Sequence, residues 1–425
     1  MDMAHDYKNQ SALRKSRWMP WCICFAASLF FFYEFIQGNM FASIADDLMR
    51  DFRIQADTLA YLSSVYYLSN VLFLFGAGII LDRFSAKKTI LIAMLSCVIS
   101  TFVLSYAESF VVAFICRFVA GIGSAFCFLG PIRIASRWFP PKRMALITGL
   151  IVTIAMTGGM LAQYPLTRLV LCIGWRPAMG WLGWLGLCIL GLMMVFIQDK
   201  HESEASQSKI NIRASAKSAY LNLQNIRAAI YASTMNMSVA VFGAVMGSLY
   251  LMQRLSIPKE SASVINTMLF LGAIIGGPLM GWISDRWGYR IAPMKLGALA
   301  SLLTMAAILY LPVTYTTMII LFFLLGLFTS TQIISYALVA ESSPPEITAM
   351  AVSIVSILTQ SGYIVFQIVF SKLLLHHGDM HVVKGVPTYS LADYQYATTL
   401  LPLGLMVAFS MLFGLRETNC QRLKG

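Results

Sequence analysis

Stretches of predominantly apolar residues, each about 20 residues long, return roughly every 30 to 40 positions along this chain. A helix of that length crosses the roughly 30 Å hydrocarbon core of a membrane. The runs show no period-two alternation, and an open sheet would leave backbone groups unpaired in lipid. We therefore predict an all-α polytopic membrane protein. The composition agrees, because 58% apolar against 12% charged residues is more apolar surface than a soluble domain can bury.

Twelve apolar runs are predicted to span the membrane, at 18–41, 57–81, 89–107, 110–131, 144–166, 177–198, 228–252, 262–283, 293–311, 316–340, 349–375 and 395–415. The longest polar stretch between them, Asp199 to Arg227, is rich in Ser, Lys and Glu and divides the spans six and six. We predict an N-terminal six-helix half at 1–198, a cytoplasmic linker at 199–227 and a C-terminal six-helix half at 228–425.

The positive charges predict the orientation of the chain. Of the 31 Lys and Arg residues, 22 lie on the side that holds both termini, eight lie in the opposite loops, and Arg117 lies inside a span. Basic loops stay in the cytoplasm, so both termini are predicted to be cytoplasmic, and the net charge of +12 needs no nucleic acid partner. The first run is longer than the apolar core of a signal peptide and contains Glu34, so we expect it to remain in the protein.

An internal repeat supports the division into halves. Gly78-x-x-x-Asp82-Arg83 follows the second span, and Gly281-x-x-x-Asp285-Arg286 follows the eighth, 203 positions later. Pro140-Pro141 before the fifth span returns as Pro344-Pro345 before the eleventh, at an offset of 204. Parallel repeats of six spans predict a transporter built from two pseudo-symmetric halves.

These two loop motifs, together with Arg117-x-x-x-Gly121-x-Gly123 in the fourth span, resemble those of the major facilitator superfamily. The resemblance covers essentially the whole chain and implies the twelve-helix fold of that superfamily. It also implies a cytoplasmic gate made by Gly78, Asp82, Arg83, Gly281, Asp285 and Arg286, in which Asp and Arg pair across the two halves. The first motif departs from the superfamily pattern, since Ser85 stands where a glycine is usual.

A finer resemblance rests on shorter motifs. These are Phe31-Phe-Tyr33-Glu34-Phe35-Ile-Gln37 with Met40-Phe41, Leu62-Ser-Ser-Val-Tyr66, Gly158-Gly159 with Ala162-Gln163-x-Pro165, and Gln360-Ser-Gly362. They look like the phagosomal transporter family of intracellular bacterial pathogens, which implies import of amino acids or nucleosides across a bacterial inner membrane. The Gly-Pro signature of drug antiporters is missing from the fifth span, which speaks against export.

Glu34 and Arg117 are the two ionisable residues well inside the spans, where a charge costs about 2.5–3.5 kcal/mol. Both fall in the outer third of the membrane, and we predict that they form an ion pair that relieves the cost of burial. Three uses stay open: proton coupling, in which the separation of the pair decides when Glu34 takes a proton; a static structural pair; and direct binding of a zwitterionic solute. The resemblance favours coupling, because proton-coupled sugar symporters of the superfamily pair an acid of span one with this arginine.

Neutral polar and phenolic side chains at helical spacing are the candidates for contacts with a solute. Interhelical packing is the alternative role for any one of them. The resemblance places spans one, four, seven and ten around a central cavity, with two, five, eight and eleven beside them. The candidates on these spans are Tyr33, Gln37, Tyr66, Tyr67, Asn70, Gln163, Asn236, Tyr250, Gln332, Tyr336, Gln360, Tyr363 and Gln367. Such groups suit a small polar solute rather than a bulky cation.

The motifs of ATP-driven pumps, zinc hydrolases and serine hydrolases do not occur in the sequence, so no enzyme, cofactor or metal is expected. We predict a monomeric secondary transporter in the lipid bilayer that imports a small polar nutrient, an amino acid or a nucleoside, by proton symport. An exporter working by proton antiport, an uncoupled facilitator and a nutrient receptor that moves no solute are the alternatives.

Overall fold

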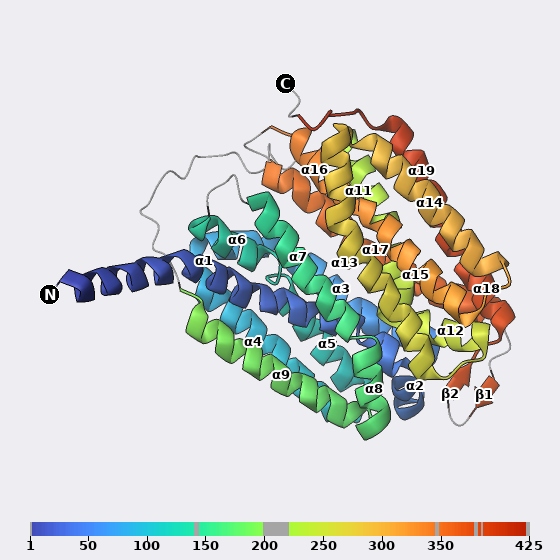
Figure 1. Ribbon diagram of the computed structural model, residues 1–425. Coiled ribbons are helices and arrows are strands. Elements are labelled where there is room, and N and C mark those ends of the chain that lie inside the picture. The colour runs from blue at the N-terminus through green and yellow to red at the C-terminus, as the bar shows by residue number, and fades with distance from the viewer. Residues whose placement is uncertain are drawn as a thin grey trace.

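The computed structural model describes residues 2–139, 144–198, 221–344, 348–377, 381–383 and 386–421. Two groups of helices lie side by side, the first coloured blue to green and the second yellow to red (Figure 1). The N- and C-termini lie toward one end of the helices, and a small hairpin lies at the other (Figure 1). We call these the termini end and the hairpin end, and we call residues 2–198 and 221–421 the two halves.

The N-terminal half contains nine helices among its described residues. They are α1 (Asp2–Asn39), α2 (Phe41–Phe52), α3 (Ala56–Arg83), α4 (Ala86–Ser105), α5 (Phe110–Ser124), α6 (Leu129–Trp138), α7 (Met144–Leu161), α8 (Tyr164–Ile173) and α9 (Trp175–Phe196).

The C-terminal half begins with α11 at Leu223, inside the segment predicted to be linker; residues 199–220 of that segment lie outside the described residues. Its elements are α11 (Leu223–Met235), a π-helix (Val239–Met246), α12 (Gly247–Leu255), α13 (Lys259–Trp287), α14 (Ile291–Tyr310), α15 (Tyr315–Thr329), a 3-10 turn (Ser330–Ile333), α16 (Ile334–Glu341), α17 (Thr348–His377), β1 (His381–Val383), β2 (Val386–Thr388), α18 (Leu391–Thr398), α19 (Leu400–Met411) and a 3-10 turn (Leu412–Gly414). Strands β1 and β2 pair antiparallel, in a loop where the sequence predicted no strand.

Eleven helical stretches of the described chain are long and apolar enough to cross a membrane. They coincide with eleven of the twelve predicted spans. At the position of the remaining one, the second, lies α3, whose 28 residues extend about 42 Å. Apart from the β1–β2 hairpin, the described chain is helical, as expected of a multi-pass membrane protein.

Glycines let the second and fourth spans of each half approach closely. A Cβ added at Gly121 of α5 would overlap the carbonyl oxygen of Tyr66 on α3, and a Cβ at Gly326 of α15 would overlap the carbonyl oxygen of Leu269 on α13. The two contacts stand at equivalent places in the internal repeat. Small residues of this kind are what membrane helices need for close packing.

Spans one, five and seven are interrupted in the half of the molecule near the hairpin end. Span one breaks at Met40 between α1 and α2, and span five breaks between Leu161 and Tyr164, where Pro165 cannot donate a helical hydrogen bond. Span seven widens into the π-helix Val239–Met246. These interruptions bring non-helical or widened backbone to the interface between the halves, where it is buried in protein rather than exposed to lipid.

Candidate functional site

Glu34 and Tyr66 form a buried polar contact between α1 and α3. Glu34 is 2% exposed, and the Tyr66 hydroxyl donates to its Oε2 at 2.8 Å and approaches its backbone carbonyl at 3.3 Å. Carboxylate Oε1 has no hydrogen-bond partner among the described residues. The close approach of α5 at Gly121 holds the backbone of Tyr66 in place.

Arg117 lies on the other side of Tyr66. Its guanidinium carbon stands 4.4 Å from the centre of the Tyr66 ring and 4.8 Å from the centre of the Phe41 ring, so the cation faces two aromatic rings. Arg117 is 1% exposed, and its Nε and Nη1 have no hydrogen-bond partner in the described part of the chain.

The predicted ion pair between Glu34 and Arg117 is therefore wrong in its geometry. No nitrogen of Arg117 lies within 4.0 Å of a carboxylate oxygen of Glu34, and both side chains are described. Tyr66 intervenes, bonding the acid through its hydroxyl and facing the cation with its ring. The two charges remain near one another but are linked through a third residue that their positions in sequence could not reveal.

Tyr33 and Gln37 face away from the interface between the halves. The Tyr33 hydroxyl donates to Thr101 Oγ1 at 2.9 Å, and Gln37 Nε2 donates to the same oxygen at 2.8 Å. Thr101 belongs to α4, which packs on α5 and α9 of its own half. In this conformation both hydrogen bonds join α1 to α4 within the N-terminal half.

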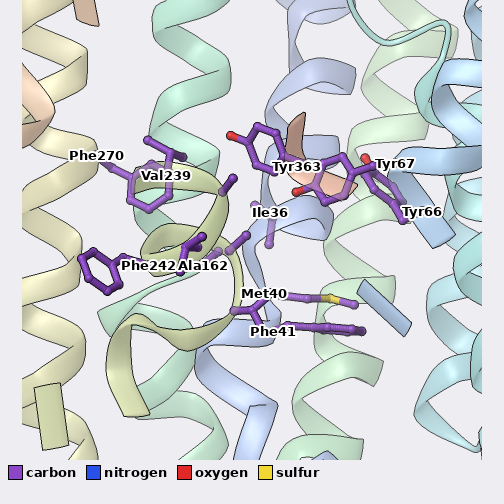
Figure 2. Packing of buried hydrophobic residues seen from close by; sticks show 14 of the residues in the cluster. Ile36, Met40, Phe41, Tyr66, Tyr67, Ala162, Val239, Phe242, Phe270 and Tyr363 are labelled. Carbon is purple, nitrogen blue, oxygen red and sulfur yellow. The ribbon is translucent and has the colours of Figure 1, made fainter. Parts of the chain in front are cut away.

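Tyr67 and Tyr363 meet across the two halves. Their ring centres are 4.5 Å apart, and the Tyr67 hydroxyl donates to the carbonyl oxygen of Gly38 at 2.8 Å. Figure 2 shows Tyr363 beside Tyr67, and Tyr66 beside Tyr67. Phe41, at the start of α2, is drawn in the same view. Asn70, one turn from Tyr66, donates to Ser124 Oγ at 2.7 Å, while its Oδ1 is buried without a partner in the described chain.

Gln163 and Gln367 are bonded to the π-helix of span seven. Gln163 lies in the break of span five, and its Nε2 donates to the Gly243 carbonyl oxygen at 2.9 Å. Gln367 of α17 donates to the Ala240 carbonyl oxygen at 3.0 Å. Asn266, which sequence reasoning missed, donates to Gln163 Oε1 at 2.6 Å and to the Phe242 carbonyl oxygen at 2.9 Å. Its polar side chain inside an apolar span was the available signal.

The remaining solute candidates lie in the C-terminal half. Asn236 ends α11, is 8% exposed, and has an Oδ1 without a hydrogen-bond partner among the described residues. The buried Tyr250 ring stacks on Phe242 with centres 5.1 Å apart. Three candidates are only partly buried. Gln332 lies in the 3-10 turn after α15, Tyr336 lies on α16, and Gln360 lies on α17.

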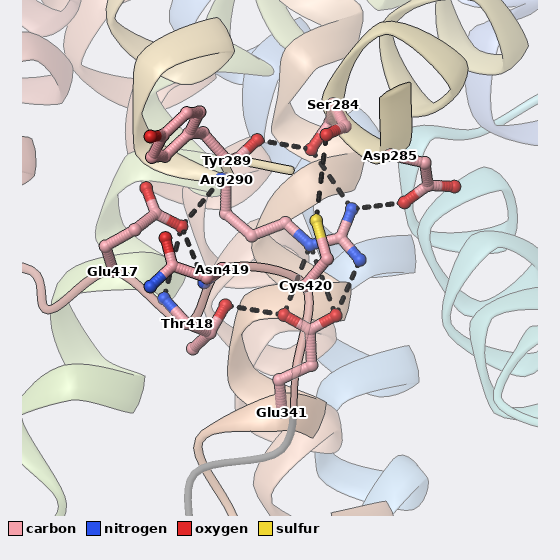
Figure 3. A network of polar contacts seen from close by, with 9 residues as sticks. All are labelled: Ser284, Asp285, Tyr289, Arg290, Glu341, Glu417, Thr418, Asn419 and Cys420. Carbon is pink, nitrogen blue, oxygen red and sulfur yellow. Dashed lines mark hydrogen bonds and ion pairs between the residues drawn. The ribbon is translucent and has the colours of Figure 1, made fainter. Parts of the chain in front are cut away.

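The gate motif of the C-terminal half forms an ion-pair network at the termini end, shown in Figure 3. Asp285 accepts from Arg290 Nη1 at 2.6 Å, and Glu341 accepts from Arg290 Nη2 at 2.5 Å. Burial alone would lower the pKa of Arg290, but its hydrogen bonds to Glu341 and Asp285 hold that pKa well above its usual range. Arg286 is exposed, with its guanidinium 5.4 Å from the Trp282 ring centre.

The predicted pairing of Asp and Arg across the halves is thus replaced, for Asp285, by a pair within its own half. Asp285 and Arg290 flank the turn at Gly288, whose φ of +71° suits glycine. In the first copy, the side chains of Asp82 and Arg83 lie outside the described residues. At Gly78 and Gly281 no atom of the described residues lies within 4 Å of an added Cβ, so neither glycine is needed for close packing against them in this conformation.

The segment after α19 completes this network. Glu417 accepts from the backbone nitrogens of Arg290 and Ile291 at 2.7 and 2.8 Å, so it caps the start of α14. Thr418 donates to Glu341 Oε2 at 2.5 Å. This contact between the chain's last described segment and the loop motif joins residues far apart in sequence, so sequence patterns alone did not predict it.

Ion pairs close the hairpin end. Lys259 at the start of α13 pairs with Asp46 and Asp47 of α2, and its side chain is 8% exposed. Arg168 of α8 pairs with Glu260 of α13 at 3.0 Å. The backbone nitrogen of Ala56 donates to the hydroxyl of Tyr389 at 3.1 Å. All of these contacts join the N-terminal to the C-terminal half.

Comparison with known proteins agrees with this architecture. Among characterised relatives, the chain is 22% identical over 263 residues to the hexuronate transporter of Bacillus subtilis (strain 168), a match of 59% of this chain and 61% of that protein. It is 23% identical over 344 residues to a probable galactarate/D-glucarate transporter of Escherichia coli (strain K12), covering 72% of this chain and 76% of that protein. A probable sulfoacetate transporter of Cupriavidus necator is 24% identical over 256 residues, covering 56% of this chain and 59% of that protein.

Solved structures with the same fold include the nucleoside transporter NupG, with a TM-score of 0.70 at 14% identity over 93% of this chain and all of that one. Another is a bacterial homologue of the human lysosomal transporter Spinster in an inward-facing, unoccupied conformation, with a TM-score of 0.70 at 15% identity over 93% and 96% of the two chains. The family model described as Major Facilitator Superfamily matches residues 23–239 and 228–419. With nearly the whole chain matched, this membrane transporter belongs to the Major Facilitator Superfamily.

Proposed function

We propose that this protein is a proton symporter that imports a small polar organic solute carrying a carboxylate group. The observation that carries the proposal is the buried set of Glu34, Tyr66 and Arg117, in which an acid and a cation are linked through one tyrosine without direct contact. An amino acid fits this description, whereas a nucleoside has no carboxylate.

The energetics of the set support proton coupling. Taking two charges out of water costs several kcal/mol per ion, and only close pairing offsets that cost. Glu34 has one carboxylate oxygen unbonded and no cation in contact, so a proton on this acid removes an uncompensated charge. Tyr66 joins the two groups, so a movement of α3 against α1 changes the surroundings of the acid and the cation together.

Arg117 supports the choice of an anionic solute. Two of its nitrogens lack acceptors among the described residues, and a buried guanidinium favours a carboxylate as partner. The named substrates of the relatives, hexuronate, galactarate or glucarate, and sulfoacetate, are all organic anions. Arg117 is 1% exposed in this conformation, so the solute reaches it only after the neighbouring spans move apart.

Alternating access would come from rocking of two halves, 1–198 and 228–425, joined by the linker 199–227. The ion pairs at the hairpin end support a conformation closed at that end. The excess of basic residues on the side that holds both termini supports a cytoplasmic position for the termini end in a bacterium. The finer resemblance to the phagosomal transporter family, and import into the cell, rest on sequence motifs and stand as part of this proposal.

The proposal is tested with purified protein in liposomes carrying an inward proton gradient. Uptake is measured for amino acids, hexuronate, glucarate and nucleosides. We expect accumulation of a carboxylate-bearing solute that collapses when a protonophore removes the gradient. Accumulation of a nucleoside alone would overturn the solute class, and binding without flux would identify a receptor.

Glu34→Gln separates coupling from transport. The variant cannot release a proton at this position, so it should lose gradient-driven accumulation and keep exchange of internal for external solute. Ser28→Ala is the control, because Ser28 is a buried polar residue on the same helix whose hydrogen bond to the Cys24 carbonyl oxygen stays within α1. Unchanged accumulation in Glu34→Gln would reject the coupling role.

A further inference from the structure

The π-helix of span seven carries an unusual concentration of side-chain amides. The residues Val239–Met246 are all buried, and three of their carbonyl oxygens, those of Ala240, Phe242 and Gly243, accept hydrogen bonds from amide side chains. A π-turn shifts the carbonyls from their places in an α-helix, which opens them to a second donor. The amides therefore act as external donors to widened backbone that is buried within the protein.

Two of these amides come from opposite halves and are bonded to each other. Gln163, in the break of span five, donates to Gly243, and Asn266 of α13 donates both to Gln163 Oε1 and to Phe242. Gln163 is completely buried, as is Asn266. Gly247 leaves the room for Asn266, since a Cβ there would lie 2.8 Å from both amide atoms.

We infer that Gln163 and Asn266 form an amide clamp that fixes the π-helix of span seven against span five and so holds the hairpin end closed. Gln163 is thereby a positioning residue of the gate rather than a ligand of the solute. The clamp is completely buried and lies between the halves, so opening of the hairpin end must break the bonds of Gln163 to Gly243 and Asn266. The same opening leaves the Gly243 carbonyl oxygen without the hydrogen bond from Gln163 Nε2.

The first test is hydrogen exchange of the purified full chain without any solute, followed by mass spectrometry of peptides covering 239–246. Gln163→Leu keeps the volume of the side chain and removes both polar contacts. Because two buried hydrogen bonds are lost, we expect exchange in 239–246 to become roughly tenfold faster. Exchange at the wild-type rate would overturn the clamp.

Gln37→Leu is the matched control. It also removes a buried amide, but its hydrogen bond to Thr101 lies within the N-terminal half, so exchange in 239–246 should not change. Asn266→Ser gives a second variant of the clamp, since serine is too short to bridge Gln163 and the Phe242 carbonyl. It should accelerate exchange in the same peptides, and a wild-type rate there would also overturn the inference.

Uptake kinetics separate a gate residue from a solute ligand. Loss of the clamp favours conformations open at the hairpin end, so Gln163→Leu should change Vmax and leave the KM for external solute unchanged or lower. A tenfold rise in KM with unchanged Vmax would assign Gln163 to the solute and overturn the clamp. Because the exchange measurement needs no solute, its outcome is independent of the proposed proton symport.

Discussion

At the scale of single residues, Tyr66 connects the two charges that the sequence singled out. Tyr66→Phe removes the hydroxyl bonded to Glu34 but keeps the ring facing Arg117, whereas Tyr66→Leu removes both. A hydrogen bond to a charged group contributes about 1.5–3 kcal/mol, so Tyr66→Phe should reduce gradient-driven uptake by roughly tenfold or more. Tyr66→Leu should also lower the melting temperature. Equal uptake by Tyr66→Phe and wild type would show that the hydroxyl plays no part in coupling.

Asp51, outside the spans, gives a prediction of pH dependence. Burial would raise the pKa of Asp51, but hydrogen bonds from Trp175 and Arg176 outweigh it and hold the pKa below its usual value near 4. A carboxyl with a lowered folded-state pKa stabilises the protein above its unfolded pKa, and this contribution is lost as the pH falls through the folded value. Asp51→Asn should therefore cost about 1 kcal/mol at pH 7 and less below pH 4.

Thermal unfolding of wild type, Asp51→Asn and Glu108→Gln across this pH range measures the effect. Glu108 is an exposed acid and serves as the control. A difference between wild type and Asp51→Asn that stays constant from pH 7 to pH 3 would contradict the assignment.

At the scale of elements, the contact of α3 with α5 depends on Gly121. An alanine Cβ there would overlap the Tyr66 carbonyl oxygen and Ser69 Oγ, so the helices must separate. Overpacking of this kind costs about 1–3 kcal/mol, and the shift of α3 also moves Tyr66 away from Glu34. Gly121→Ala should lower both the melting temperature and coupled uptake. Gly149→Ala, where no atom from the described part of the chain lies within 4 Å of the added Cβ, should leave both unchanged.

At the scale of the whole molecule, Lys259 joins the halves through Asp46 and Asp47. Lys259→Ala leaves two neighbouring carboxylates without this cation, so we expect a shift of roughly tenfold toward conformations open at the hairpin end. Spin labels at the exposed positions Tyr106 and Leu311, in a cysteine-free background, should report longer distances between the halves. Lys295→Ala, in the C-terminal half and over the Phe413 ring, is the control. An unchanged distance distribution in Lys259→Ala would contradict the role of this ion pair.

The sequence by itself determined the environment of the chain, its helical class and its repeat. Hydropathy and the periodicity of apolar runs are local properties that can be read from the sequence. Lipid permits few backbone structures, so few other fold classes were possible. The sequence also picked out Glu34 and Arg117, because an ionisable residue within an apolar run stands out without any knowledge of its neighbours.

Only the tertiary structure decided what those residues touch. Tyr66 between the two charges, Thr101 as the partner of Gln37, and Arg290 as the partner of Asp285 all depend on how far each helix rotates and slides against its neighbours. Helical spacing places a side chain on a face but does not say which helix that face meets. The amide bonds to the π-helix depend further on a local widening of the backbone, and they join segments that are far apart in sequence.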